Sequence, residues 1–208
     1  MNYSTNLLLK KPEDDDGSGV LSDLNYNWDI LDAMVHALNI KGIWKEVFTD
    51  VAAASATVIH AAITGNDAIQ NITTAITNPG EARNATITGS AGAAGNVVLT
   101  GLVRGIEDTE ILILDGTTLV KGNKAFDTIS NIKVPAELTA GKTVSVGFGD
   151  KFGLQHEIDA IGQVYKITVN AVELTSTYAA LVNATYGTID FSTVGVYQDM
   201  VVYYYQLT

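Results

Sequence analysis

The stretch Gln163-Val164-Tyr165-Lys166-Ile167-Thr168-Val169-Asn170 decides the fold class of this chain. Apolar Tyr165, Ile167 and Val169 alternate with the polar residues that follow each of them. Alternation with a period of two is typical of a β-strand that turns one face to a core and the other to water. An antiparallel sheet is therefore expected around this segment.

Similar short segments fill the chain from Ala82 to its end, separated by turns that contain Gly, Asn or Asp. Strands that recur roughly every 8–12 residues predict a β-sandwich or barrel. The fold is expected to be mainly β, with an antiparallel sandwich-like domain over residues 81–208. The expected strands are 84–88, 96–103, 110–114, 118–121, 125–134, 143–148, 163–170, 188–191 and 200–207.

The first 45 residues have a different pattern. Residues 1–19 are expected to form an extended arm, because Pro12 and the acidic and glycine-rich run after it do not hold a regular element. A helix follows and ends at Gly42. Its apolar residues recur at spacings of three and four, which predicts either an amphipathic helix on its own domain or a short parallel coiled coil. These residues are Leu21, Leu24, Trp28, Leu31, Val35 and Leu38.

The segment between these parts, residues 46–80, is expected to connect them. Residues 43–76 leave helix and strand open, because Ala52-Ala53-Ala54 favours a helix whereas residues 57–64 alternate like a strand. At the other end of the chain, Val201, Tyr203 and Tyr205 belong to a strand that is apolar on both faces. As a free edge it would aggregate, so it is expected to lie inside a sheet or under a neighbouring subunit.

Composition excludes several classes of function. The net charge is −11, with only 12 Lys and Arg residues, so nucleic acid is not an expected partner. Cysteine is absent, which excludes disulfides and thiolate metal sites. No signal peptide is visible, and no apolar run reaches the roughly 20 residues of a membrane span. No membrane partner is expected.

Three motifs resemble chemical sites without the necessary context. Ala136–Thr143 fits a relaxed phosphate-loop pattern, but a strand-like segment follows where the loop needs a helix, so a hairpin turn is expected. Gly147–Gly153 departs from the dinucleotide fingerprint, and glycine-dependent turns are expected there. The histidines His36, His60 and His156 lack metal-ligand spacing. Neither a metal nor any other cofactor is expected.

An enzyme is not expected either. A glycosidase would need two carboxylates at a defined separation, which sequence does not show. The available candidates are Asp150, Glu157, Asp159, Glu173 and Asp190.

Two stretches resemble structural proteins of tailed bacteriophages. Tyr3–Pro12, reading YSTNLLLKKP, and Leu21–Asp32, reading LSDLNYNWDILD, are similar to the N-terminal segment of phage tail-fibre and minor structural proteins. In those proteins the segment attaches an appendage to the particle and begins a trimeric stem. The resemblance implies docking through Leu7, Leu9 and Pro12 and a homo-oligomer, with a trimer favoured.

The second stretch covers roughly residues 60–154. The residues that carry it are His60–Thr64, Ile76–Pro79, Arg83-Asn84, Gly122–Phe126 and Val146–Leu154. Together they look like a domain that recurs in virion proteins of phages of Gram-positive and environmental bacteria.

The resemblances imply a non-enzymatic virion protein, made in the host cytoplasm, that binds phage capsid or tail proteins as a capsid-decorating head fibre or a tail-fibre component. Val201, Tyr203 and Tyr205 would add subunit contacts. The alternative is a receptor-binding module for host-surface glycans, in which Tyr178, Tyr186 and Tyr197 stack on sugar rings.

Overall fold

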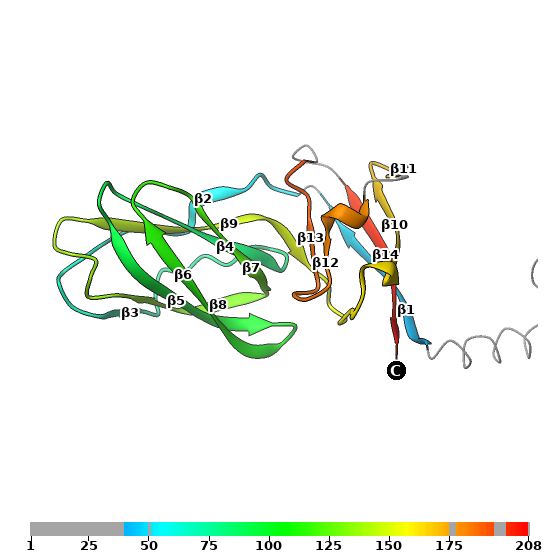
Figure 1. The fold of residues 1–208 in the computed structure, drawn as a ribbon, viewed down its shortest axis with the longest axis horizontal. Helices are drawn as coiled ribbons and strands as arrows, with labels where there is room; N and C mark the ends of the chain where they lie inside the picture. Colours follow the sequence, from blue (N-terminus) through cyan, green and yellow to red (C-terminus); the bar gives the residue numbers. More distant parts are fainter. Residues whose placement is uncertain (1–39, 50, 175–177, 194–198, 208) are drawn as a thin grey trace, which may run out of the picture. The chain divides into compact units, whose positions relative to one another are not determined.

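The computed structural model describes residues 40–49, 51–174, 178–193 and 199–207 (Figure 1). Within them the protein is mainly β, with antiparallel sheets in a sandwich-like arrangement, as the alternating segments predict. The chain divides into two compact units, residues 44–204 and residues 1–43 with 205–208. Of the smaller unit, the structure describes only residues 40–43 and 205–207.

Two sheets of the larger unit enclose its first core. One has the order β3-β8-β5-β6; the other has the order β12-β13-β9-β4-β7, with β2 also paired to β9. Their buried faces meet through side chains such as Leu99, Ile132 and Val146. The bounds are β2 (Ser55–Thr64), β3 (Gln70–Ile72), β4 (Arg83–Gly89), β5 (Ala94–Val103), β6 (Ile106–Asp115), β7 (Val120–Phe126), β8 (Thr128–Val134), β9 (Thr143–Gly153), β12 (Val182–Asn183) and β13 (Thr188–Asp190).

A third sheet, with the order β1-β14-β10-β11, covers the second core. Its strands are β1 (Ile40–Phe48), β10 (Val164–Val169), β11 (Val172–Glu173) and β14 (Met200–Leu207), and two short 3₁₀ helices lie at η1 (Ile161–Gln163) and η2 (Tyr178–Leu181). Phe48, Phe152 and Phe191 pack against one another in this core, with ring centroids 5.2 to 6.4 Å apart.

Strand β9 contributes to both cores. Val144, Val146 and Phe148 lie in the first core, and Phe152 lies in the second. The strand pairs with β2 along its first half, with β4 from Val144 to Phe152, and with β13 along its last residues. One continuous strand therefore ties the two cores of the larger unit together.

The ambiguous segment after residue 43 is β, not helical. Residues 55–64 form β2, and residues 70–72 form β3. The expected connecting segment 46–80 thus contributes to all three sheets, through the end of β1, β2 and β3. The expected helix end at Gly42 is wrong, because β1 already begins at Ile40 and Gly42 lies inside it. The apolar series from Leu21 to Leu38 lies outside the described residues.

Three other expectations needed correction. Gly147–Gly153 lies within β9 and not at a turn. The expected strand 125–134 is divided at Asp127, where the chain passes from β7 in one sheet to β8 in another. Tyr165 does not share the buried side of Ile167, since the β10–β14 pairing shifts register between Val164 and Lys166. Tyr165 remains 45% exposed whereas Ile167 is fully buried.

Candidate functional site

A groove of about 510 Å³ lies along the end of β1. This volume falls within the range of pockets that hold small ligands. Its acidic side chains are Glu46, Glu81 and Asp127, and Lys45 is its one basic side chain among the described residues. The remaining lining residues are Val47, Phe48, Gly80, Ala82, Gly153 and Gln155.

Glu46 is the most constrained side chain of the groove. Its Oε1 accepts hydrogen bonds from the hydroxyl of Tyr204, at 2.7 Å, and from the backbone N–H of Gln155, at 2.5 Å. Its Oε2 is buried without a hydrogen-bond partner among the described residues. Burial raises the pKa of Glu46, and the bonds from Tyr204 and Gln155 offset part of that rise.

An aromatic stack is connected to the Glu46–Tyr204 hydrogen bond through His156. The rings of Trp44 and His156 are stacked, with centroids 3.6 Å apart and an interplanar angle of 18°. The backbone N–H of His156 donates to the Tyr204 hydroxyl at 3.2 Å. Burial raises the pKa of Tyr204, and the hydrogen bond to Glu46 raises it further. Strand β1 is therefore fastened to β14 and to the loop after β9 by side chains as well as by packing.

Arg83 is a buried cation that bonds to backbone carbonyl groups. Nε donates to the carbonyl oxygen of Gly149 at 2.8 Å, Nη2 donates to the same oxygen, and Nη1 donates to the carbonyl oxygen of Ala52 at 2.8 Å. The guanidinium lies over the rings of Phe148 and Phe152, at 4.1 and 4.5 Å from their centroids. Burial lowers the pKa of Arg83 to about 10, although Asp150 and Glu81 act in the opposite direction. These contacts indicate a structural role.

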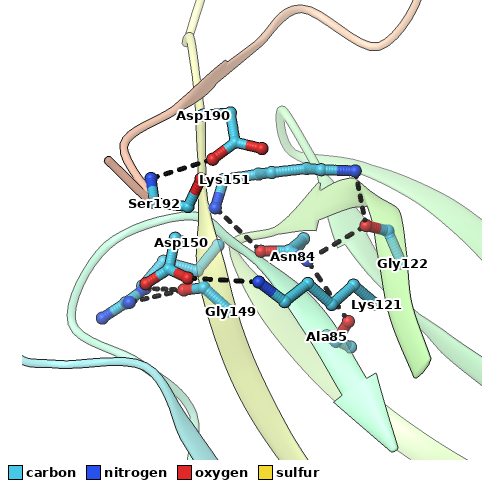
Figure 2. Close-up of polar contacts among 10 residues, drawn as sticks. Asn84, Ala85, Lys121, Gly122, Gly149, Asp150, Lys151, Asp190 and Ser192 are labelled. Carbon is cyan, nitrogen blue, oxygen red and sulfur yellow. Dashed lines mark hydrogen bonds and ion pairs between the residues drawn. The ribbon is translucent and has the colours of Figure 1, made fainter. Parts of the chain in front are cut away.

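Asn84 joins three strands beside Arg83 (Figure 2). Its Nδ2 donates to the carbonyl oxygen of Gly122 on β7 at 3.0 Å, and its Oδ1 accepts the N–H of Lys151 on β9 at 2.9 Å. The ammonium group of Lys151 reaches Asn123 Oδ1 at 2.6 Å. Three of the segments that carry the second resemblance, around Arg83-Asn84, Gly122–Phe126 and Val146–Leu154, therefore meet here. Their contacts hold strands together.

The expected acid–base candidates are distributed over ion pairs, a turn and the exposed surface. Asp150 is 3.5 Å from Lys121 Nζ, Glu157 is 3.9 Å from Arg104 Nη2, and Glu173 is 3.4 Å from Lys166 Nζ. Asp190 accepts the backbone N–H of Ser192 at 2.9 Å, as Figure 2 shows, and Asp159 is exposed. None of these five lines the groove.

The groove carboxylates were missed from the sequence, although one signal was present. Glu46 occupies an inward position between Trp44 and Phe48 in an alternating strand, where an apolar residue is the norm. A charged residue at such a position indicates a buried, hydrogen-bonded group. Glu81 and Asp127 carry no comparable signal, because they come from separate turns.

The rejected motifs are structural. Strand β9 follows residues 135–142, where a phosphate loop needs a helix. The expected hairpin turn is wrong, because these residues connect β8 in one sheet to β9 in another. His60 lies on β2, His156 lies on the loop after β9, and His36 lies outside the described residues. Within the part of the chain that the structure describes, no group of three or more His, Asp or Glu side chains is arranged to hold a metal ion.

The predicted binding residues are placed only in part. Leu7, Leu9, Pro12 and the series Leu21, Leu24, Trp28, Leu31, Val35 and Leu38 lie outside the described residues, as does Tyr197. Strand β14 lies between β1 and β10, which confirms the interior-strand alternative. Val201, Tyr203 and Tyr205 are half-buried, alternating with the fully buried Val202 and Tyr204. Tyr178 begins η2, and Tyr186 lines a small pocket that shares Asp127 and Gln155 with the groove.

Comparison with known proteins finds no matching family model, no matching curated protein and no matching solved structure. Among the described residues, no helix is long and apolar enough to cross a membrane.

Proposed function

We propose that the protein is a non-enzymatic structural component of a tailed-bacteriophage particle, a capsid-decorating head fibre or a tail-fibre component. In this proposal the N-terminal arm docks onto the particle through Leu7, Leu9 and Pro12, and the β body is displayed outside it. The resemblance of Tyr3–Pro12 and Leu21–Asp32 to phage attachment segments supports the arm's role.

The observation that carries the proposal is the way in which the chain enters the β body. Strand β1 begins at Ile40, eight positions after Asp32, where the segment that resembles an attachment stem ends. Phe48 packs in the second core, Trp44 packs against it, and Glu46 is bonded to Tyr204 on β14. Because β1 is built into a sheet and a core, force that reaches Ile40 passes into the folded body.

The contacts around Arg83 and Asn84 support a role in resisting mechanical force. Arg83 links β4 to β9 and to the segment after β1 through three hydrogen bonds to carbonyl oxygens. Asn84 links β4 to β7 and β9. Charge-assisted bonds from a buried cation are among the stronger contacts of a protein interior, so they resist shear between neighbouring strands.

Particle reconstitution tests the proposal. Purified particles that lack the protein are mixed with the full-length chain, with a chain lacking residues 2–19, and with a Leu7→Asp, Leu9→Asp double variant. Only the full-length chain is expected to sediment with particles. Circular dichroism and thermal melting of all three proteins serve as the control for folding. Full binding by the two arm variants would contradict the proposed docking.

A second candidate function, recognition of host-surface glycans, is favoured by the groove. Carboxylates such as Glu81 and Asp127 accept hydrogen bonds from sugar hydroxyls, and the Tyr186 ring lies at the adjoining small pocket. Titration of the full chain with maltotetraose, with tetrameric N-acetylglucosamine and with its de-acetylated form tests this candidate. Binding that is weakened by Asp127→Asn but not by the exposed Asp159→Asn would support it, and lack of binding to all three sugars would remove it.

A further inference from the structure

The outward surface of the third sheet combines exposed apolar side chains with lysines. We define the β14 face as Lys45 and Val47 on β1, Tyr165 and Lys166 on β10, Glu173 on β11, and Val201 and Tyr203 on β14. Val47 is 50% exposed and Tyr165 is 45% exposed. Large apolar side chains side by side on a solvent-facing sheet are typical of a surface that a partner covers.

Tyr203 lies at the centre of the β14 face. Its ring lies 6.2 Å from the ring of Tyr165, and Lys45 Nζ and Lys166 Nζ lie 5.9 and 5.7 Å from its centroid. Aromatic rings flanked by cations supply both buried area and cation–π attraction at protein interfaces. The face therefore contains the residue types that anchor protein–protein contacts.

The charge of this face differs from that of the whole chain. The chain carries 23 acidic and 12 basic residues, so identical copies repel one another over most of their surface. The β14 face carries two lysines and one glutamate, with Lys166 Nζ 3.4 Å from Glu173. It has charges of both signs, so identical copies that meet here can exchange Lys–Glu pairs.

The β14 face and the predicted stem are close in sequence. Leu38, the last residue of the apolar series, is seven residues before Lys45. Seven residues span at most about 25 Å when fully extended. If identical chains associate through their apolar series, Lys45 of each chain lies within about 25 Å of the end of that series.

We propose that the partner of the β14 face is a second copy of this chain, so that neighbouring copies pack through Val47, Val201 and Tyr203. The inference rests on the proposed function, because it uses the predicted stem that gathers the copies. It differs from the expectation made from the sequence, which placed the subunit contact at a free strand edge. Strand β14 has neighbours on both edges, so the contact is made through side chains on its face.

Molar mass by light scattering across a range of concentrations tests the inference on the full chain. Val47→Glu and Tyr203→Glu are each expected to raise the dissociation constant of the oligomer at least tenfold. Ile111→Glu and Ile113→Glu are the matched controls, because these residues are 60% and 65% exposed on the outer face of the β3-β8-β5-β6 sheet. Both controls are expected to leave the mass unchanged. Lys45→Glu gives a second test with an exposed residue, in case Tyr203→Glu fails to fold.

Amine cross-linking of mixed ¹⁵N-labelled and unlabelled wild-type chains provides an independent readout. Intermolecular links are expected to join Lys45 and Lys166 of different copies. A monomeric wild-type chain, or intermolecular links confined to Lys133 and Lys142, would overturn the inference. So would an oligomer that dissociates on Leu24→Lys, Leu31→Lys substitution but is unaffected by all three changes on the β14 face. The particle-binding assay is separate, so the proposed function can stand if this inference fails.

Discussion

The hydroxyl of Tyr204 on β14 donates a 2.7 Å hydrogen bond to Oε1 of Glu46 on β1, so two segments 158 residues apart in sequence share a buried proton donor and acceptor. The bond joins the strand that follows the N-terminal arm to the last strand of the chain. It also places a carboxyl group where burial raises its pKa. The stability of the second core is therefore expected to depend on this pair.

Replacing Tyr204 by Phe is expected to lower the free energy of unfolding by about 1–3 kcal/mol, because it removes one donor from a buried carboxyl whose other oxygen has no partner among the described residues. Urea denaturation measures the change. Tyr203→Phe is the control, since Tyr203 lies on the opposite side of the same strand and its ring contacts do not require the hydroxyl group. An equal effect of the two substitutions would argue against the importance of the Glu46 bond.

Glu46 is expected to make the protein less stable as the pH rises. Its pKa in the folded chain lies above the ordinary value of 4.5, so the neutral form is favoured by folding. That contribution is fully present below pH 4.5 and is lost as the pH rises through the folded pKa. Unfolding of the wild type and of Glu46→Gln from about pH 4 to 7 should show the wild type losing stability relative to the variant. A stability difference between the wild type and Glu46→Gln that stays constant with pH would contradict the raised pKa of Glu46.

Asp108 is expected to affect the pH dependence of stability in the opposite direction from Glu46. Its pKa is lowered, chiefly by the hydrogen bond from Lys124, whose Nζ is 2.6 Å from Oδ1. The stabilisation is present above the ordinary pKa of 3.8 and is lost as the pH falls through the lowered value. Asp108→Asn should therefore differ from the wild type at neutral pH and converge with it in acid. Divergence in acid would be inconsistent with the Lys124 contact.

Arg83→Met is expected to destabilise the chain by about 2–4 kcal/mol, because the carbonyl oxygens of Gly149 and Ala52 lose charged donors inside the protein. Chemical denaturation tests this value. Lys121→Met removes an exposed cation of the same region and is expected to change stability by no more than about 0.5 kcal/mol. Comparable losses for the two variants would indicate that the buried bonds contribute little.

Gly147→Ala is expected to be among the most damaging small substitutions. A Cβ at this position would lie 1.7 Å from the carbonyl oxygen of Ser55, where β2 runs against β9. Backbone atoms on a paired strand cannot move away easily, so a loss of about 3 kcal/mol or a failure to fold is expected. Gly162→Ala is the control, because nothing lies within 4 Å of its added Cβ. An unchanged thermal melting temperature for Gly147→Ala would show that β2 is free to shift.

Local pattern predicted most of the strands. Residues 200–207 were expected as one strand and form β14 with the same bounds, and residues 96–103 coincide with all but the first two residues of β5. Alternating side chains and flanking turn residues act within a few residues of the chain, so a single sequence contains that information. Prediction failed at Gly147–Gly153, where glycines were interpreted as turns. These residues lie in β9. Glycine is needed at Gly147 and Gly149 because the backbone of β2 and the side chain of Asn84, respectively, come too close for a Cβ.

The amino-acid sequence by itself determined the β class, the positions of most strands from residue 82 onward, and the rejection of a phosphate loop. Only the tertiary structure decided that residues 55–64 are a strand and that β14 lies inside a sheet. It also decided that Glu46, Glu81 and Asp127 share one groove. The physical reason is distance along the chain: alternation and turn chemistry are local, whereas strand partners, buried hydrogen bonds and grooves are made by residues tens to more than a hundred positions apart.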